Sequence, residues 1–171
     1  NLLYVRPGAT QESGVRTAQG SAATLTVEDA TALADPVLAP AVALVSPQVN
    51  SFAQVIAGGQ NVQTQVWGVT PEFQYIRGME LADGEFISER DVQAKSSVLV
   101  LGSTVANTLF PDAAAVGQAV RVQNQPFRVV GVLVSKGGTG FGTQDDAVIA
   151  PLSTVQSRLS RQRTVSGSLT V

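Results

Sequence analysis

Residues 52–69 read FAQVIAGGQNVQTQVWGV, and this stretch decides the kind of fold that the chain can form. Two runs rich in apolar residues, Phe52–Ala57 and Val62–Val69, enclose the sequence Gly-Gly-Gln-Asn at 58–61. Glycine and asparagine accept the backbone angles of a tight turn, and alternating apolar runs on either side are typical of paired strands. The stretch therefore predicts a β-hairpin.

The second strand of this hairpin carries apolar side chains in both directions. Val66 falls on one face, whereas Trp67 and Val69 fall on the other, because successive side chains of a strand alternate. A strand that is apolar on both faces is expected to contact other parts of the protein on both sides. A further strand, Ala41–Val49, is predicted to precede the hairpin.

Short helices and additional strands are expected along the rest of the chain. Thr26 and Asp29 form a capping-box pattern for a helix that begins at Val27 and ends before Pro36. Residues 8–23 and 71–89 are predicted to be a loop and an irregular linking segment. The other predicted elements are a strand at 97–101, a helix capped by Ser103 with Val105, Leu109 and Phe110 inward, a hairpin over 120–134, a strand at 147–150, a helix opened by Pro151 with Leu152, Val155 and Leu159 inward, and a strand from Val165. This mixture indicates an α+β fold with mixed sheets rather than a doubly wound one.

Composition excludes several classes of function. Hydrophobic residues make up 44% of the 171 residues and charged residues 14%, which is typical of a folded globular chain. The absence of Cys and His excludes disulfides and Ser-His or Cys-His catalysis, and the net charge of -2 without a basic block disfavours nucleic acid. The apolar runs are too short to span a bilayer. Both ends interrupt apparent strands, so we expect the chain to be a piece of a longer polypeptide.

The polar residues are compatible with three kinds of chemical site. The glycine-rich stretch 136–142 could approach an anion, but its Lys136 precedes the glycines, contrary to a nucleotide-binding loop. Asp145 and Asp146 could bind a cation with upstream carboxylates, yet the spacing is not that of an EF-hand, and on a strand the two would point to opposite faces. A glycosidase-like carboxylate pair is a further alternative. Capping and solvation are the preferred interpretation.

The aromatic residues have two interpretations. Trp67, Phe73, Tyr75 and Phe86 could line a binding surface, but core packing is preferred. Phe141 lies among glycines and is the best candidate for an exposed aromatic side chain. We therefore predict a loop for partner contact that includes Lys136, Gly140 and Phe141.

Taken in order, these segments resemble the periplasmic core domain of MacB-type, FtsX-like ABC transporter permeases, over nearly the whole chain. The residues that carry the resemblance are Thr26-Val27-Glu28-Asp29-Ala30, Val66-Trp67-Gly68-Val69 with Phe73, Gly78, Leu81-Ala82-Asp83-Gly84-Glu85-Phe86, Asp91, Val98-Leu99-Val100-Leu101-Gly102, Leu109-Phe110-Pro111, Val116-Gly117-Gln118, Phe127-Arg128-Val129-Val130-Gly131-Val132, Lys136-Gly137, Asp145-Asp146 and Ala150-Pro151-Leu152. Each motif is common alone, and the ordered series is the specific part.

The resemblance implies a two-part organisation. A Porter-like subdomain would comprise residues 1–70 plus 165–171, and an inserted Sabre-like subdomain would comprise 71–164. In the family the last strand continues into a further helix and strand, so the Porter-like sheet is expected to be incomplete in this chain.

The resemblance also implies a function. The domain would be extracytoplasmic and non-catalytic, without a cofactor, and would couple ATP-driven movement of transmembrane helices to export or mechanotransmission outside the cytoplasmic membrane. The expected partners are the helices of the same permease, an ABC ATPase on a separate cytoplasmic domain or chain, a second permease copy, and a periplasmic adaptor or other extracytoplasmic protein. The alternatives are an extracytoplasmic module that binds a ligand or peptide, and an enzyme with a site made only of carboxylates.

Overall fold

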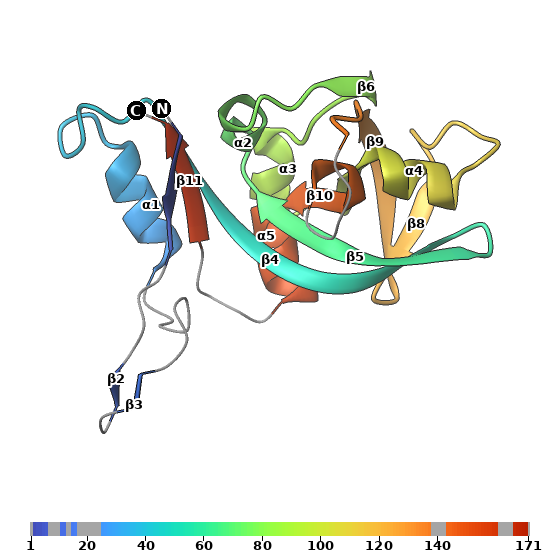
Figure 1. Ribbon diagram of the computed structural model, residues 1–171, viewed down its shortest axis with the longest axis horizontal. Helices are drawn as coiled ribbons and strands as arrows, with labels where there is room; N and C mark the ends of the chain where they lie inside the picture. The colour runs from blue at the N-terminus through green and yellow to red at the C-terminus, as the bar shows by residue number, and fades with distance from the viewer. Residues whose placement is uncertain are drawn as a thin grey trace.

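The computed structural model describes residues 2–6, 11–12, 15–16, 25–137, 143–160 and 166–170. Its main feature is a nine-stranded mixed sheet in the order β1-β11-β4-β5-β10-β7-β9-β6, with β8 paired to β4 and β9 (Figure 1). The strands are β1 (Leu2–Val5), β4 (Leu44–Ala57), β5 (Gln60–Val69), β6 (Leu81–Gly84), β7 (Val98–Leu101), β8 (Ala119–Val122), β9 (Gln125–Leu133), β10 (Ala147–Pro151) and β11 (Ser166–Thr170). The predicted α+β class with mixed sheets is confirmed.

The long strand β4 is shared by two groups of strands. Its first residues pair with β11, and Val49–Ala57 pair with β5 in the predicted hairpin, whose turn is Gly58-Gly59. The sequence predicted two separate strands here, 41–49 and 52–57, and this was wrong. Asn50 and Ser51 do not interrupt the strand because they pair with Trp67 and Val66 of β5, so the partner strand continues past them.

The first and last described strands lie side by side at one end of the molecule (Figure 1). Leu2 of β1 is the register partner of Thr170 of β11, and Thr170 is in turn the partner of Leu44 of β4. The helix α1 (Val27–Ala34) packs against β4 in the same part of the fold. The predicted capping box is confirmed: the Thr26 hydroxyl accepts from the Asp29 N–H, and the Asp29 carboxylate accepts from the Thr26 N–H.

The segment 71–89, predicted to be irregular, is more ordered than expected. It contains the helix α2 (Glu72–Ile76), the strand β6 and the first residue of the helix α3 (Glu89–Ala94). Ser88 and Asp91 form a second capping box at the start of α3. The prediction failed because helices of five and six residues are too short to show an apolar period.

Smaller differences concern the remaining helices and the predicted loop at 8–23. Within that loop, β2 (Gln11–Glu12) pairs with β3 (Val15–Arg16). The helix α4 (Ser103–Leu109) has Gly102, not Ser103, as its N-cap, and Phe110 is only half-buried. The inward residues Leu152, Val155 and Leu159 are confirmed, in α5 (Leu152–Thr154) followed by the π-helical turn η2 (Val155–Leu159).

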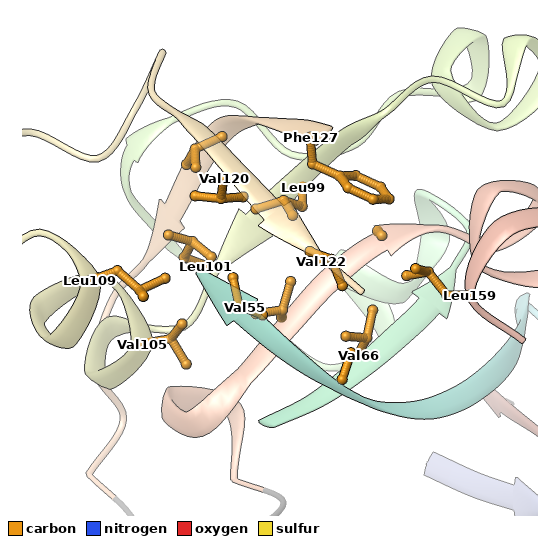
Figure 2. Packing of buried hydrophobic residues seen from close by; sticks show 14 of the residues in the cluster. Val55, Val66, Leu99, Leu101, Val105, Leu109, Val120, Val122, Phe127 and Leu159 are labelled. Atoms are coloured by element: carbon orange, nitrogen blue, oxygen red, sulfur yellow. The ribbon is translucent and has the colours of Figure 1, made fainter. Parts of the chain in front are cut away.

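Two apolar clusters lie on opposite faces of the central strands. The larger one contains Val55, Val66, Leu99, Leu101, Val105 and Phe127 (Figure 2). The smaller one contains Trp67, Val69, Phe73 and Ile149. Because Val66 and Trp67 belong to different clusters, the predicted contacts on both faces of β5 are confirmed. Among the described residues, no helix is long and apolar enough to cross a membrane.

Candidate functional site

The predicted partner-contact loop is described only at its base. Gly140 and Phe141 lie outside the described residues. Lys136 is exposed and follows the end of β9, and the chain is described again from Thr143, which leads into the 3₁₀ turn η1 (Gln144–Asp146). We call Ser135–Gly137 together with Thr143–Asp146 the loop base.

Asp145 holds the two sides of the loop base together. Its Oδ1 accepts a hydrogen bond from the backbone N–H of Lys136 at 3.0 Å. Its Oδ2 accepts from the Ser135 hydroxyl at 2.7 Å and from the Gly137 N–H at 3.0 Å. The residue is only 4% exposed. One carboxylate therefore accepts three hydrogen bonds from Ser135, Lys136 and Gly137, and these bonds join the two sides of the loop base.

These donors also set the protonation state of the carboxylate. The backbone hydrogen bond from Lys136 lowers the pKa of Asp145, and burial opposes this effect while Ser135 and Gly137 add to it. Hydrogen bonds to the charged form stabilise it against protonation. Asp145 is thus ionised at neutral pH with its oxygens engaged, which suits it to structure rather than to acid–base chemistry.

The turn η1 corrects an expectation about the two aspartates. Asp145 and Asp146 lie on a 3₁₀ turn and not on a strand, so the argument from opposite faces of a strand does not apply. Across the part of the chain that the structure describes, no group of three or more acidic residues is placed to hold a metal ion.

Gly102 packs closely against the backbone of the loop base at Gln144 and Asp145. A β-carbon at this position would lie 2.4 Å from the carbonyl oxygen of Gln144 and 2.5 Å from that of Asp145. Its N–H donates to the carbonyl of Ala147 at 2.8 Å. Only glycine permits this close approach of two backbones, which explains the glycine directly after β7.

Lys136 connects the loop base to the end of α2. Its ammonium Nζ donates to the carbonyl oxygens of Gly78 and, at 3.2 Å, of Arg77. The Arg77 guanidinium in turn lies 5.5 Å from the centre of the Tyr4 ring and 5.8 Å from that of Phe73, and it donates to the Tyr4 hydroxyl. Cation–π contacts of this kind contribute about 0.5–1 kcal/mol each at exposed sites.

The aromatic residues divide between core and surface. Trp67 and Phe73 are buried and meet edge to face, with ring centroids 6.1 Å apart, so the preferred core interpretation is right for both. Phe86 is half-buried. Tyr75 is 73% exposed, and the core prediction is wrong for it because α2 is a single short turn whose buried face carries Phe73 and Ile76.

Sequence reasoning missed Arg77 and Tyr4, and no local pattern could have paired residues 73 positions apart. It noticed Asp145 but not its partners. The usable signal was a pair of adjacent acids, Asp145 and Asp146, placed shortly after a Ser-Lys-Gly sequence that follows a strand.

The whole chain matches one family model. This model is described as the MacB-like periplasmic core domain and matches residues 1–171. The macrolide export ATP-binding/permease protein MacB of Rhodospirillum rubrum is 41% identical over 168 residues, which are 97% of this chain and 25% of that protein. MacB of Syntrophobacter fumaroxidans is 37% identical over 162 residues, which are 94% of this chain and 22% of that protein. The chain therefore spans about a quarter of the length of these relatives.

Solved structures show the same fold. The periplasmic region of MacB from Actinobacillus actinomycetemcomitans matches with a TM-score of 0.81 at 20% identity, over 99% of this chain and 73% of that one. The extracellular domain of the noncanonic ABC-type transporter YknZ from Gram-positive bacteria matches with a TM-score of 0.80 at 16% identity, over 100% of this chain and 83% of that one. At these identities, the likeness concerns the fold alone.

Proposed function

We propose that this chain is a non-catalytic part of an ABC transporter permease, because it belongs to the family of MacB-like periplasmic core domains. This part would couple ATP-driven movement of transmembrane helices to export or mechanotransmission outside the membrane. Its relatives are named ATP-binding/permease proteins, which supports this proposal. The ATPase would reside on a separate cytoplasmic domain or chain. A second permease copy and an extracytoplasmic adaptor are the further proposed partners.

The observation that carries the proposal is the pairing of the two terminal strands. Leu2 and Thr170 are register partners, and β11 continues the ladder to β4. The membrane helices that flank the domain would therefore act on one sheet at neighbouring points, one through β1 and the other through the further helix and strand that are expected after β11. Hydrogen-bonded strands move together, so a displacement there would reach the β4–β5 hairpin along a single strand.

The proposed subdomains follow the family pattern. Residues 1–70 plus 165–171 would form the Porter-like part, and 71–164 the Sabre-like part. Because β10 pairs in parallel with β5, the two parts would share one sheet rather than be joined by a flexible linker. A shared sheet favours transmission of movement over independent motion.

Cysteine labelling in the parent polypeptide tests the location. The chain contains no Cys, so a single Asn61→Cys substitution at the exposed hairpin gives a unique target within it. In a parent protein with its other cysteines removed, a membrane-impermeant maleimide should label this site in spheroplasts. Labelling only after the membrane is disrupted would overturn the extracytoplasmic location.

A second labelling experiment tests the coupling. Leu3 in β1 is 50% exposed. The labelling rate of Leu3→Cys should differ between nucleotide-free and hydrolysis-trapped forms of the reconstituted transporter. Thr104→Cys, exposed on α4, serves as the control with a constant rate. Equal rates for Leu3→Cys in both states would contradict coupling and leave the location standing, which would favour the ligand- or peptide-binding alternative.

A further inference from the structure

A continuous series of contacts leads from the edge strand β1 to the loop base. Tyr4 of β1 accepts a hydrogen bond from the Arg77 guanidinium and stacks beneath it. The carbonyl oxygens of Arg77 and Gly78 accept from the ammonium of Lys136. The backbone N–H of Lys136 then donates to Asp145. Three parts of the chain that are distant in sequence are thus joined through the side chains of Tyr4, Arg77, Lys136 and Asp145.

Arg77 is the residue at which the two halves of this series meet. Its side chain faces β1, and its carbonyl oxygen faces the loop base. The guanidinium also contacts Phe73, which is 1% exposed and fixed in the smaller apolar cluster against Trp67. Because Phe73 cannot yield without disturbing the core, a shift of Tyr4 must be taken up by Arg77 and the short segment that follows α2.

Lys136 carries the series from the end of α2 into the loop base. It uses its ammonium toward Arg77 and Gly78 and its backbone toward Asp145. A displacement of the Lys136 ammonium therefore acts on a residue whose backbone N–H donates to the Asp145 carboxylate. Charge-assisted hydrogen bonds at both ends make this connection short and directional.

We propose that Arg77 and Lys136 form a conformational relay that transmits displacement of β1 to the loop base at Asp145. The relay rests on the proposed coupling function and gives it a route through named residues. It would let movement of β1 change the position of the Lys136 side chain at the surface.

Amide hydrogen exchange on the chain itself tests the relay. In Tyr4→Ala, the amides of Lys136 and Gly137 should exchange about two- to tenfold faster, a change typical of coupling between neighbouring groups. In a Lys136→Met background, which keeps the side-chain length but removes the ammonium, Tyr4→Ala should change the exchange of these amides no further. Tyr4→Phe, which keeps the ring and removes only the hydroxyl, should give a smaller acceleration of the same amides.

Two controls separate the relay from general loosening. Tyr75→Ala alters an exposed ring on α2, the helix that Arg77 ends, and should leave the exchange rates of the Lys136 and Gly137 amides unchanged. The amide of Arg128, which donates to the Ser97 carbonyl at 2.9 Å, reports opening of the sheet and should keep its rate in Tyr4→Ala.

The relay is overturned if Tyr4→Ala leaves the loop-base amides unchanged, or if it accelerates them equally with and without the Lys136 ammonium. The measurement requires neither membrane nor nucleotide. Its failure is therefore distinguishable from failure of the proposed function, which the cysteine labelling of the parent protein decides.

Discussion

Asp145 and Lys136 are joined by a hydrogen bond of 3.0 Å from the Lys136 backbone N–H to the carboxylate, nine residues apart in sequence. Replacement of Asp145 by Asn would leave one neutral amide oxygen to accept from the three donors, and its NH₂ group, which is itself a donor, would face one or more of them. We expect Asp145→Asn to lower the free energy of unfolding by about 1–2 kcal/mol, because hydrogen bonds to a charged group contribute more than neutral ones. Asp146→Asn, at the next position, is the matched control and should change it by less than about 0.5 kcal/mol in urea unfolding.

Acid should weaken the fold through the same carboxylate. Hydrogen bonds lower the pKa of Asp145 below the ordinary value of 3.8. For Asp91 burial is the largest single effect and raises the pKa, but the hydrogen bonds from Ser88 and Ser96 together with the charge of Arg90 lower it overall. A group whose folded pKa is depressed contributes stability above its unfolded pKa and loses it as pH falls through the folded value. The urea midpoint should therefore be constant from about pH 7 to 5 and fall below about pH 4. Asp145→Asn should show a shallower fall, and an equal fall would argue against this role.

Gly102→Ala should be strongly destabilising although the substitution is small. The new β-carbon would lie 2.4 Å from the Gln144 carbonyl oxygen, and backbone atoms cannot rotate away as a side chain would. Forced overlap in a packed region costs about 1–3 kcal/mol. Calorimetry should show a fall in Tm of about 2–4 °C for each kcal/mol in a chain of this size. Thr104→Ala, on the exposed face of α4, should leave Tm nearly unchanged, and a similar fall for both would disprove the steric cause.

Phe73 should be a principal contributor to the smaller apolar cluster. The side chain is 1% exposed and meets Trp67 edge to face. Phe73→Ala should lower the free energy of unfolding by about 3–5 kcal/mol, through lost burial and the cavity that remains. Trp67 is the single tryptophan of the chain, so its fluorescence follows this region without labelling. Tyr75→Ala, two positions later and 73% exposed, should have an effect below about 0.5 kcal/mol.

Local sequence predicted those features whose causes are local. The capping box at Thr26 and the hairpin turn depend on residues within a few positions, and both were predicted. The turn itself is shorter than predicted, because only Gly58 and Gly59 form it and Gln60 already pairs with Ala57. The capping box of Ser88 and Asp91 was equally readable and was overlooked among the turn residues before it. The continuity of β4 could not be predicted, because the partners that hold Asn50 and Ser51 in the strand belong to β5.

The loop base shows the same division more clearly. The sequence indicated a glycine-rich segment with Lys136 at its start, and the structure places Lys136 at the surface. The contacts that hold Lys136 in place come from Asp145, Gly78 and Arg77, which lie up to 59 positions from it in the sequence. A single sequence carries no signal for such pairs, so the anchoring of the loop base had to come from the structure.

The register between β1 and β11 determines how the molecule resists a pulling force. Leu2 lies opposite Thr170, so a load that draws these two residues apart acts across the ladder and opens its four register pairs one after another, like a zipper. A load that displaces both strands together along their axes would instead meet all the hydrogen bonds of β11 and β4 at once. The fold should thus be compliant to separation of its terminal strands and stiff to their joint translation. Single-molecule pulling along these two directions should give a low and a high rupture force respectively.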